Sequence, residues 1–257
     1  LGFGLLMKIQ AITMFPEMFH SITEYGVTGR AHKQGLWHFN AINPRQFADN
    51  KLGYIDDRPF GGGPGMIMMA PPLYAAIEHA KAQAHQPQQA KVIYLSPQGT
   101  PFTHQKAVEL AQLSDCILLC GRYEGIDERL LQHSVDEEIS IGDFVVSGGE
   151  LPAMLLMDAV LRLITGVLGD QESAEQDSFA NGLLDCPHYT KPIEFQGMVV
   201  PEILRSGHHG LIAEWRLKES LRRTLARRPD LLAKRHFIPQ ESRLLQQIQQ
   251  EQQDIPS

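Results

Sequence analysis

The apolar positions in the first two thirds of the chain fall into short runs that predict β-strands. Residues 91–95 are apolar after Lys91 and residues 116–120 are apolar throughout, as expected for strands that are buried on both faces. Residues 8–15, 36–42 and 137–141 give three further strands.

Longer segments between these runs predict helices. They cover residues 17–25, 71–86, 103–113 and 150–165, and Thr103 is a suitable N-cap for the third. Strands that alternate with helices indicate an α/β fold with a parallel sheet covered on both faces. Ligands of such sheets bind at the carboxyl ends of the strands, so the loops after the strands are the first candidates for a site.

The pattern changes near residue 168. Residues 168–182 are polar and lack a clear period, which predicts a flexible linker between an α/β domain at residues 7–167 and a helical, basic domain at residues 183–257. In the second domain a leucine stripe and an arginine face lie on different sides of one predicted helix. The leucine stripe consists of Leu217, Leu221 and Leu225. The arginine face consists of Arg216, Arg223 and Arg227. The Gln-rich tail after Ile238 predicts a frayed helix.

Charge separates the same two parts of the chain. The net charge is −7 over 257 residues, which argues against a surface that binds nucleic acid everywhere. Residues 201–236, however, carry nine Lys/Arg against four Asp/Glu, a net charge of +5. This asymmetry predicts one basic face for a polyanion; a solvated helical surface is an equally good interpretation of the charge alone.

The remaining composition narrows the class of protein. Cys116, Cys120 and Cys186 have no C-x-x-C spacing, so they predict neither a disulfide framework nor a zinc site, and they suggest a reducing cytoplasm. The apolar stretch at residues 151–164 is too short and too interrupted to span a membrane. We interpret residues 1–6 as a leader ahead of a natural start at Met7, without the features of a signal peptide.

Glycines cluster in the loops that follow the three later strands. A loop that packs its backbone against a flat ligand needs glycine, because a Cβ atom would block the approach. One such loop is most simply a turn, but three at neighbouring strand ends predict a site. The Walker, dinucleotide, zinc-protease and nucleophile-elbow motifs are absent from the sequence, which leaves a ligand held mostly by backbone and apolar walls. The six glycines are Gly99, Gly121, Gly125, Gly142, Gly148 and Gly149.

Several long motifs resemble the bacterial tRNA (guanine-N1)-methyltransferase family, from Met7 to about residue 236. Phe144 stands where family members often have tyrosine. The motifs are YLSPQG at 94–99, LCGRYEGIDER at 119–129, ISIGDFVVSGGELPA at 139–153, GGGPGM at 61–66, QDSF at 176–179 and LDCPHYT at 184–190.

The resemblance implies a knotted, SPOUT-type methyltransferase. Its fold would be an α/β sheet with a deep trefoil knot at the cofactor site, followed by a small helical C-terminal domain. The enzyme would be a cytoplasmic homodimer with the active site at the subunit interface, would methylate guanine 37 of tRNA, and would be associated with a magnesium requirement. S-adenosylmethionine would bind to Tyr94, Leu95, Ser96, Pro97, Gln98, Gly99, Gly121, Tyr123, Glu124, Gly125, Ile141, Gly142, Asp143, Phe144, Val145, Val146, Gly148, Gly149 and Pro152.

Two further residues would carry the chemistry that the resemblance implies. Asp177 would be the general base that removes the proton from guanine N1, and Arg162 would stabilise the negative charge that develops on O6. Without the resemblance, Asp177 is more simply a solvated linker acid, and Arg162 an ion-pair partner of Asp158. Glu124 is a carboxylate that would orient the cofactor's amino group or face its sulfonium; Asp127 would do the same or cap the following helix.

The tRNA contacts implied are Ser178, His188 and the arginine face of Arg216, Arg223 and Arg227. His188 would stack on a base, although a packed turn after Pro187 is the simpler interpretation. Two alternative functions stay open at this point. One is methylation of another RNA atom on the same fold. The other is a ligand-sensing regulator that binds nucleic acid and needs neither Asp177 nor Arg162.

Overall fold

A computed structural model describes residues 6–169 and 176–253 of the chain. The chain divides into two compact units, Leu1–Gln171 and Glu172–Ser257. Most of the predicted leader at 1–6 and part of the predicted linker at 168–182 lie outside the described residues.

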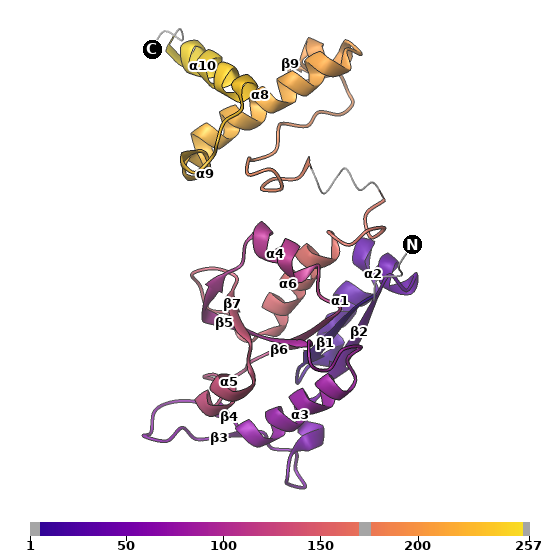
Figure 1. The fold of residues 1–257 in the computed structure, drawn as a ribbon, viewed down its shortest axis with the longest axis vertical. Helices are drawn as coiled ribbons and strands as arrows, with labels where there is room; N and C mark the ends of the chain where they lie inside the picture. The colour runs from indigo at the N-terminus through magenta and orange to yellow at the C-terminus, as the bar shows by residue number, and fades with distance from the viewer. Residues whose placement is uncertain (1–5, 170–175, 254–257) are drawn as a thin grey trace. The chain divides into compact units, whose positions relative to one another are not determined.

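The first unit is built on a five-stranded parallel sheet, as the strand pattern predicts (Figure 1). Its strands lie in the order β2-β1-β6-β5-β7. The central strand β6 is buried along its whole length, which explains its continuous apolar run. The bounds are β1 Met7–Ile12, β2 Trp37–Ile42, β5 Lys91–Pro101, β6 Asp115–Leu119 and β7 Glu137–Ser140.

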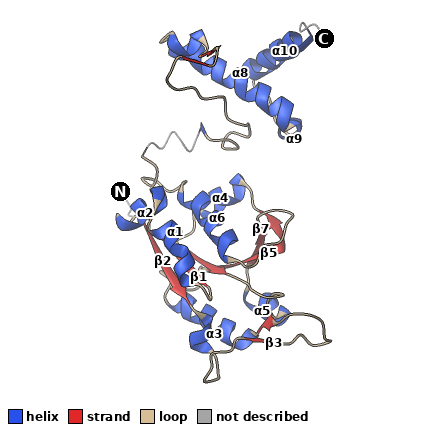
Figure 2. Ribbon diagram, turned by 180° about the vertical axis from the view of Figure 1, so that it is seen from behind, coloured by secondary structure: helices blue, strands red, loops and turns tan. Residues whose placement is uncertain are grey.

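Helices cover both faces of this sheet, and each face has its own apolar core (Figure 2). One core contains Phe19, Leu110 and Leu156 from the helices η1, α4 and α6, with α1 and α2 on the same face. The other contains Ile77 of α3 and Leu130 of α5. The bounds are η1 Pro16–Phe19, α1 His20–Thr23, α2 Gly26–Lys33, η2 Pro44–Phe47, α3 Ala70–Ala82, α4 His104–Leu110, α5 Glu128–Ser134 and α6 Glu150–Leu161.

Local capping fixes several of these bounds. The hydroxyl of Thr103 accepts from the backbone nitrogen of Lys106 at 3.3 Å, so the predicted N-cap of α4 is confirmed. Asp127 accepts from the backbone nitrogen of Arg129 at 3.0 Å and caps α5. Capping is therefore a role that the structure gives to Asp127.

Some elements differ from the pattern. The segment after Leu95 does not end the strand: after a register shift, Thr100 and Pro101 pair with β7, so β5 continues to Pro101. Helix α6 ends at Leu161 rather than near 165. Inside the predicted loop at 43–65 and just after it, a short hairpin forms from β3 Asp56–Asp57 and β4 Ile67–Met68.

The second unit packs its helices around a small leucine core. Leu221 is fully buried there and Leu217 and Leu225 pack against it, which confirms the predicted stripe. The tail after Ile238 forms a helix, as predicted, but this helix, α10, is regular rather than frayed because Leu244 and Ile248 are buried in this core. The bounds are β8 Glu194–Phe195, β9 Met198–Val199, η3 Glu202–Arg205, α8 His209–Arg227, α9 Pro229–Ala233 and α10 Pro239–Gln253.

Within the described residues, none of the helices has the length and apolar character that crossing a membrane requires.

Candidate functional site

A cavity of about 380 Å³ lies at the ends of β6 and β7, next to the register shift that follows Leu95 in β5. This is the edge of the sheet at which ligands of parallel α/β folds bind, and the volume is in the range of small-molecule sites. The three glycine-bearing loops form its walls. Its lining comprises residues 94–98, 121–125, 139–142, 144–149 and 152.

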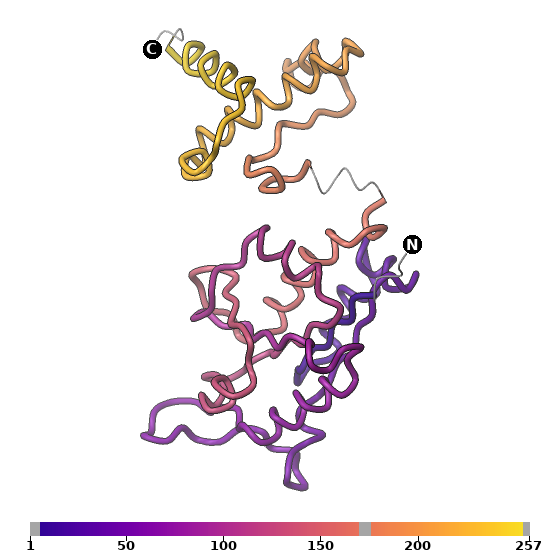
Figure 3. Tube along the Cα trace, in the orientation of Figure 1, coloured from indigo at the N-terminus to yellow at the C-terminus, as the bar shows by residue number. Residues whose placement is uncertain are grey.

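The loops converge because the chain after β7 turns back to β6. The backbone nitrogen of Gly149 donates to the carbonyl of Gly121 at 2.8 Å, although β5 lies between these two strands in the sheet. A Cβ atom on Gly149 would come within 2.7 Å of the Cα of Cys120. Glycine is therefore required here by the close approach of two protein segments, and the path from β7 to α6 can be followed in Figure 3.

Tyr94 lies on the inner wall of the cavity. Its ring packs against Gly121, where an added Cβ would be 2.9 Å from the phenol oxygen. Burial, with a smaller effect from the nearby Glu138, raises the pKa of Tyr94 to about 12. The hydroxyl therefore stays protonated at neutral pH and is a hydrogen-bond donor beside the cavity.

The cavity has little net charge. Arg122 and Glu124 are the charged residues in its lining. Arg122 is neutralised by Glu150, a fully buried carboxylate whose Oε2 lies 2.8 Å from the arginine Nε. The charge that remains belongs to Glu124. This balance suits a ligand with a cationic group better than a phosphate.

Glu124 also joins the cavity to the glycine-rich loop before β4. Its backbone nitrogen donates to the carbonyl of Met66 at 3.0 Å. A Cβ on Gly65 would be 2.4 Å from the Cγ of Glu124, so this glycine lets the two segments touch. The GGGPGM motif at 61–66 thus ends beside the wall that carries Glu124.

The cavity gathers most of the residues expected to hold the cofactor. Gly99 and Asp143 are not in its lining. Gly99 packs against β7 instead, where an added Cβ would lie 2.4 Å from the backbone nitrogen of Ile139. The sequence reasoning missed four lining residues, Arg122, Ile139, Ser140 and Ser147. Arg122 and its partner Glu150 lie inside the motifs at 119–129 and 139–153. A charged residue next to a glycine turn is the sequence signal that could have identified them.

Arg162 is outside the cavity lining. It caps the C-terminal end of α6, where its backbone nitrogen donates to the carbonyl of Asp158 at 3.2 Å, and its side chain is partly buried. The same helix begins at Glu150 beside the cavity. Arg162 therefore lies on the rigid element that leads out of the third cavity loop.

The other catalytic and tRNA-binding candidates belong to the second unit. Asp177 is partly buried in a turn where its carbonyl accepts from the backbone nitrogen of Ala180 at 3.2 Å. The hydroxyl of the neighbouring Ser178 accepts from the backbone nitrogen of Asp185 at 3.0 Å. This contact ties the turn with Asp177 to the segment that carries His188.

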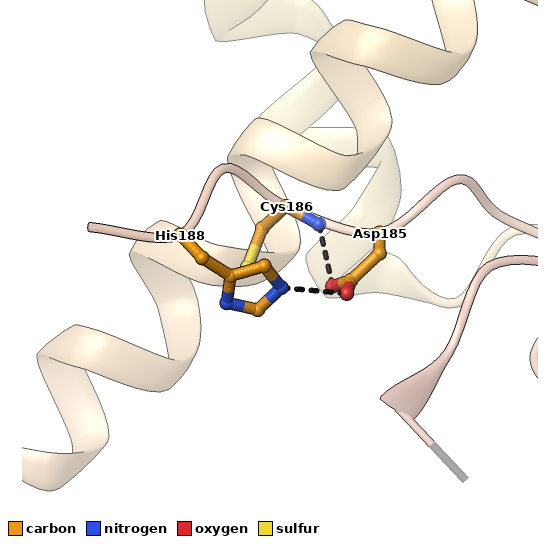
Figure 4. A group of neighbouring side chains, drawn as sticks. All are labelled: Asp185, Cys186 and His188. Carbon is orange, nitrogen blue, oxygen red and sulfur yellow. Dashed lines mark hydrogen bonds and ion pairs between the residues drawn. The ribbon is translucent and has the colours of Figure 1, made fainter. Parts of the chain in front are cut away.

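His188 is hydrogen-bonded to an acid from its own turn. Its Nε2 lies 2.7 Å from Oδ2 of Asp185, and the backbone nitrogen of Cys186 donates to the same carboxylate (Figure 4). Partial burial acts to raise the pKa of Asp185, but these hydrogen bonds outweigh it and lower the pKa. Most of the imidazole is exposed, so it can still meet an external group.

These three side chains also form a possible metal-binding group, the one found among the described residues. Mg²⁺ takes oxygen ligands, whereas this group offers one carboxylate, one thiol and one imidazole. The group gives the magnesium expectation no support.

The arginine face behaves as a free cationic surface. Arg216 and Arg227 are exposed and Arg223 is partly buried. Within residues 176–253, none of the three forms an ion pair, while Arg228 pairs with Asp230. Neighbouring Lys218 and Arg222 both pair with Glu251.

Comparison with known proteins places this chain in a family. The family model for tRNA (Guanine-1)-methyltransferase TrmD matches residues 7–234. The chain is 79% identical over 251 residues to a tRNA (guanine-N(1)-)-methyltransferase from Neisseria meningitidis, covering 98% of this chain and 100% of that protein. A protein of the same name from Chromobacterium violaceum is 59% identical over 248 residues, covering 96% and 97%. The chain belongs to the tRNA (guanine-1)-methyltransferase family TrmD.

Proposed function

We propose that this protein transfers a methyl group from S-adenosylmethionine to N1 of guanine 37 in tRNA. The observation that carries the proposal is the cavity at the ends of β6 and β7, because residues of the motifs at 94–99, 119–129 and 139–153 form its walls. The relatives that match nearly the whole chain are named for methylation of the same guanine atom.

The volume of the cavity and the charge of its lining support the methyl donor as its ligand. Apolar and backbone groups make up much of its walls, and Glu124 supplies a carboxylate for the sulfonium or the amino group. Arg122 offers no free positive charge to repel the ligand, because Glu150 neutralises it. The donor supplies an electrophilic methyl group on a positively charged sulfur.

The chain's own residues would make guanine N1 a nucleophile. In our proposal the carboxylate of Asp177 takes the N1 proton as N1 attacks the methyl carbon, and the carbon–sulfur bond breaks to release S-adenosylhomocysteine. The guanidinium of Arg162 stabilises the negative charge that moves onto O6. An unpaired guanine is cheaper to turn outward into such a site than a paired one.

We further propose that the chain is knotted at the cavity. The segment after β7 returns to β6 across the end of β5, and residues 96–101 of β5 extend over toward β7. A chain that crosses beneath this arc would form the trefoil knot, an exception to the usual absence of knots in proteins.

The proposed assembly is a homodimer whose active site lies at the subunit interface. Apolar side chains are exposed on the third cavity loop and on the adjoining α6, with Val145 at 83% exposure the most prominent. Exposed apolar patches beside a site are typical of protein interfaces, and a second copy of the chain is the partner that we propose. The patch comprises Phe144, Val145, Leu151 and Leu155.

The domain roles follow from the same proposal. Residues 7–167 would bind the cofactor and 168–182 would link the domains. Residues 183–257 would bind tRNA through His188 and the arginine face, together with Ser178 in the linker. We infer a cytoplasmic location from the tRNA substrate and from the three free, buried cysteines.

A methyl-transfer assay tests the function. Purified protein is incubated with S-adenosylmethionine labelled in the methyl group and with unmodified tRNA, and the tRNA is digested to nucleosides. We expect label in 1-methylguanosine, and none when guanine 37 is replaced. Label in another nucleoside would favour the alternative enzyme, and no label would contradict the proposal.

The variant Asp177→Asn tests the general base. We expect turnover to fall by about 10²–10⁴-fold, because an amide cannot accept the N1 proton, while cofactor affinity stays close to that of the wild type. The matched control is Asp230→Asn, the same change at an exposed acid of the second unit. A near-normal rate for Asp177→Asn would remove it from the mechanism.

A further inference from the structure

A fully buried carboxylate lies beneath the cavity and joins three segments of the first unit. Glu150, the first residue of α6, accepts a hydrogen bond from the hydroxyl of Thr13 at 2.8 Å. Its other oxygen lies 2.8 Å from Nε of Arg122. A buried carboxylate needs such partners because water no longer solvates it.

Arg122 connects the second cavity loop to the third. Its Nη1 donates to the carbonyl of Ser147 at 3.1 Å, and its guanidinium lies 4.5 Å from the centre of the Phe15 ring. A Cβ on Gly148 would come within 2.2 Å of Nε, so this glycine is what lets the arginine lie along the loop. Arg122 and the residues 147–149 thus hold each other in place.

The two loops joined in this way both line the cavity. Arg122 itself is in the lining, whereas Glu150 lies just behind it. The pair therefore affects the cavity in two ways that can be separated. It fixes the spacing of residues 121–125 and 141–149, and it cancels the positive charge that Arg122 would otherwise present to the ligand.

We propose that Arg122 and Glu150 are positioning residues, oriented by Thr13, that set the cavity's preference for the cationic methyl donor over the neutral product. This proposal rests on the proposed function. S-adenosylmethionine has a positive sulfur, and S-adenosylhomocysteine, which remains after methyl transfer, does not. An unneutralised guanidinium in the wall would weaken binding of the donor and leave the product less affected.

The test compares the affinities of the two ligands by calorimetric titration of the full chain. For Glu150→Gln we expect weaker binding of both, with the donor losing at least about fivefold more than the product, because the positive charge of Arg122 is then unopposed. In the double variant Arg122→Met with Glu150→Gln the charge is absent. There the donor-to-product ratio should return to the wild-type value while both affinities stay reduced.

Two further variants separate this role from general damage to the fold. Thr13→Val should weaken both ligands modestly and equally, because it removes the hydroxyl and no charge. Glu137→Gln is the matched control: Glu137 pairs with Lys91 at 2.7 Å in the same unit and is not in the cavity lining. It should leave both affinities unchanged, and thermal unfolding of every variant reports whether it is folded.

The outcomes distinguish this proposal from the proposed function. If the wild type binds neither ligand, the proposed cofactor is wrong. If the wild type binds both and folded Glu150→Gln keeps the wild-type ratio, the charge role of the pair is wrong. Should Glu150→Gln fail to fold, Arg122→Lys decides: it keeps the charge balance, so an altered ratio in that variant would contradict the proposal.

Discussion

The glycines of the three loops led from the sequence to the site, but the reason we gave for them was incomplete. We expected them to admit a flat ligand, and the structure shows that several admit other parts of the protein. Gly121 makes room for Tyr94, Gly148 for Arg122, and Gly149 for the backbone at Cys120. Because close packing of loops and close approach of a ligand both demand glycine, the sequence signal was the same.

The variant Gly99→Ala tests this packing role at a residue outside the cavity lining. Its Cβ would meet the backbone of Glu138 and Ile139 at 2.4 Å, and backbone cannot move aside as a flexible side chain would. We expect the free energy of unfolding to fall by about 1–3 kcal/mol, as for other overpacked sites. Denaturant unfolding measures it.

Gly210→Ala is the control for that substitution. Nothing lies within 4 Å of its added Cβ, and the residue is in α8. There alanine should be neutral or slightly stabilising, since it is the better helix former. Equal effects of the two substitutions would show that the contact at Gly99 carries no energy.

Elements were predictable where one physical signal dominated. The five strands of the sheet follow from apolar runs, and α4 from its Thr103 cap. Helix α10 was predicted as a helix, but its regularity was not, because its burial depends on Leu244 and Ile248 meeting leucines of distant α8, which a local pattern does not reveal. The extension of β5 after Leu95 depends in the same way on a partner strand. Long-range contacts, rather than local propensity, decided both cases.

Glu241, near the start of α10, predicts how the stability of the protein depends on pH in acid. The carboxylate of Glu241 is nearly fully buried and accepts from Arg235 at 2.6 Å, which lowers the pKa of Glu241. A carboxyl group whose pKa is lower in the folded state stabilises the fold at pH values above its pKa in the unfolded chain, which is about 4.3. That contribution is lost as the pH falls through the pKa of the folded state.

We therefore expect Glu241→Gln to be less stable than the wild type near pH 7, by about 1–3 kcal/mol, and the difference to shrink below pH 4. Thermal unfolding followed by circular dichroism between pH 7 and 3 measures both. Glu251→Gln is the comparison: its carboxylate also pairs with cations but its side chain is 47% exposed, so its effect should be smaller. A difference that grows in acid would reverse the assigned sign.

At the scale of the whole molecule, the cavity, the candidate catalytic residues and the basic surface are divided between two units. The first holds the cavity and Arg162, and the second holds Asp177, His188 and the arginine face. The sequence revealed the division through its net charge of +5 at residues 201–236, but charge alone did not say which arginines are available. The structure narrows the choice, because among residues 176–253 Arg222 and Arg228 form ion pairs whereas Arg216, Arg223 and Arg227 form none, and these three are the ones that we propose contact tRNA.

This selection predicts a salt dependence. Each cation that neutralises a phosphate releases counterions, so the logarithm of the affinity falls with the logarithm of the salt concentration by about 0.7–0.9 for each contact. Replacing both Arg223 and Arg227 with alanine should therefore weaken tRNA binding and make the slope shallower by about 1–2. Filter binding from 50 to 300 mM salt measures both quantities.

Arg228→Ala is the matched control, because Asp230 already neutralises that guanidinium at 2.7 Å, and it should change the slope less. An unchanged slope in the double variant would place the tRNA phosphates elsewhere, and an equal change in Arg228→Ala would show that ion pairing within the unit does not decide which arginines bind.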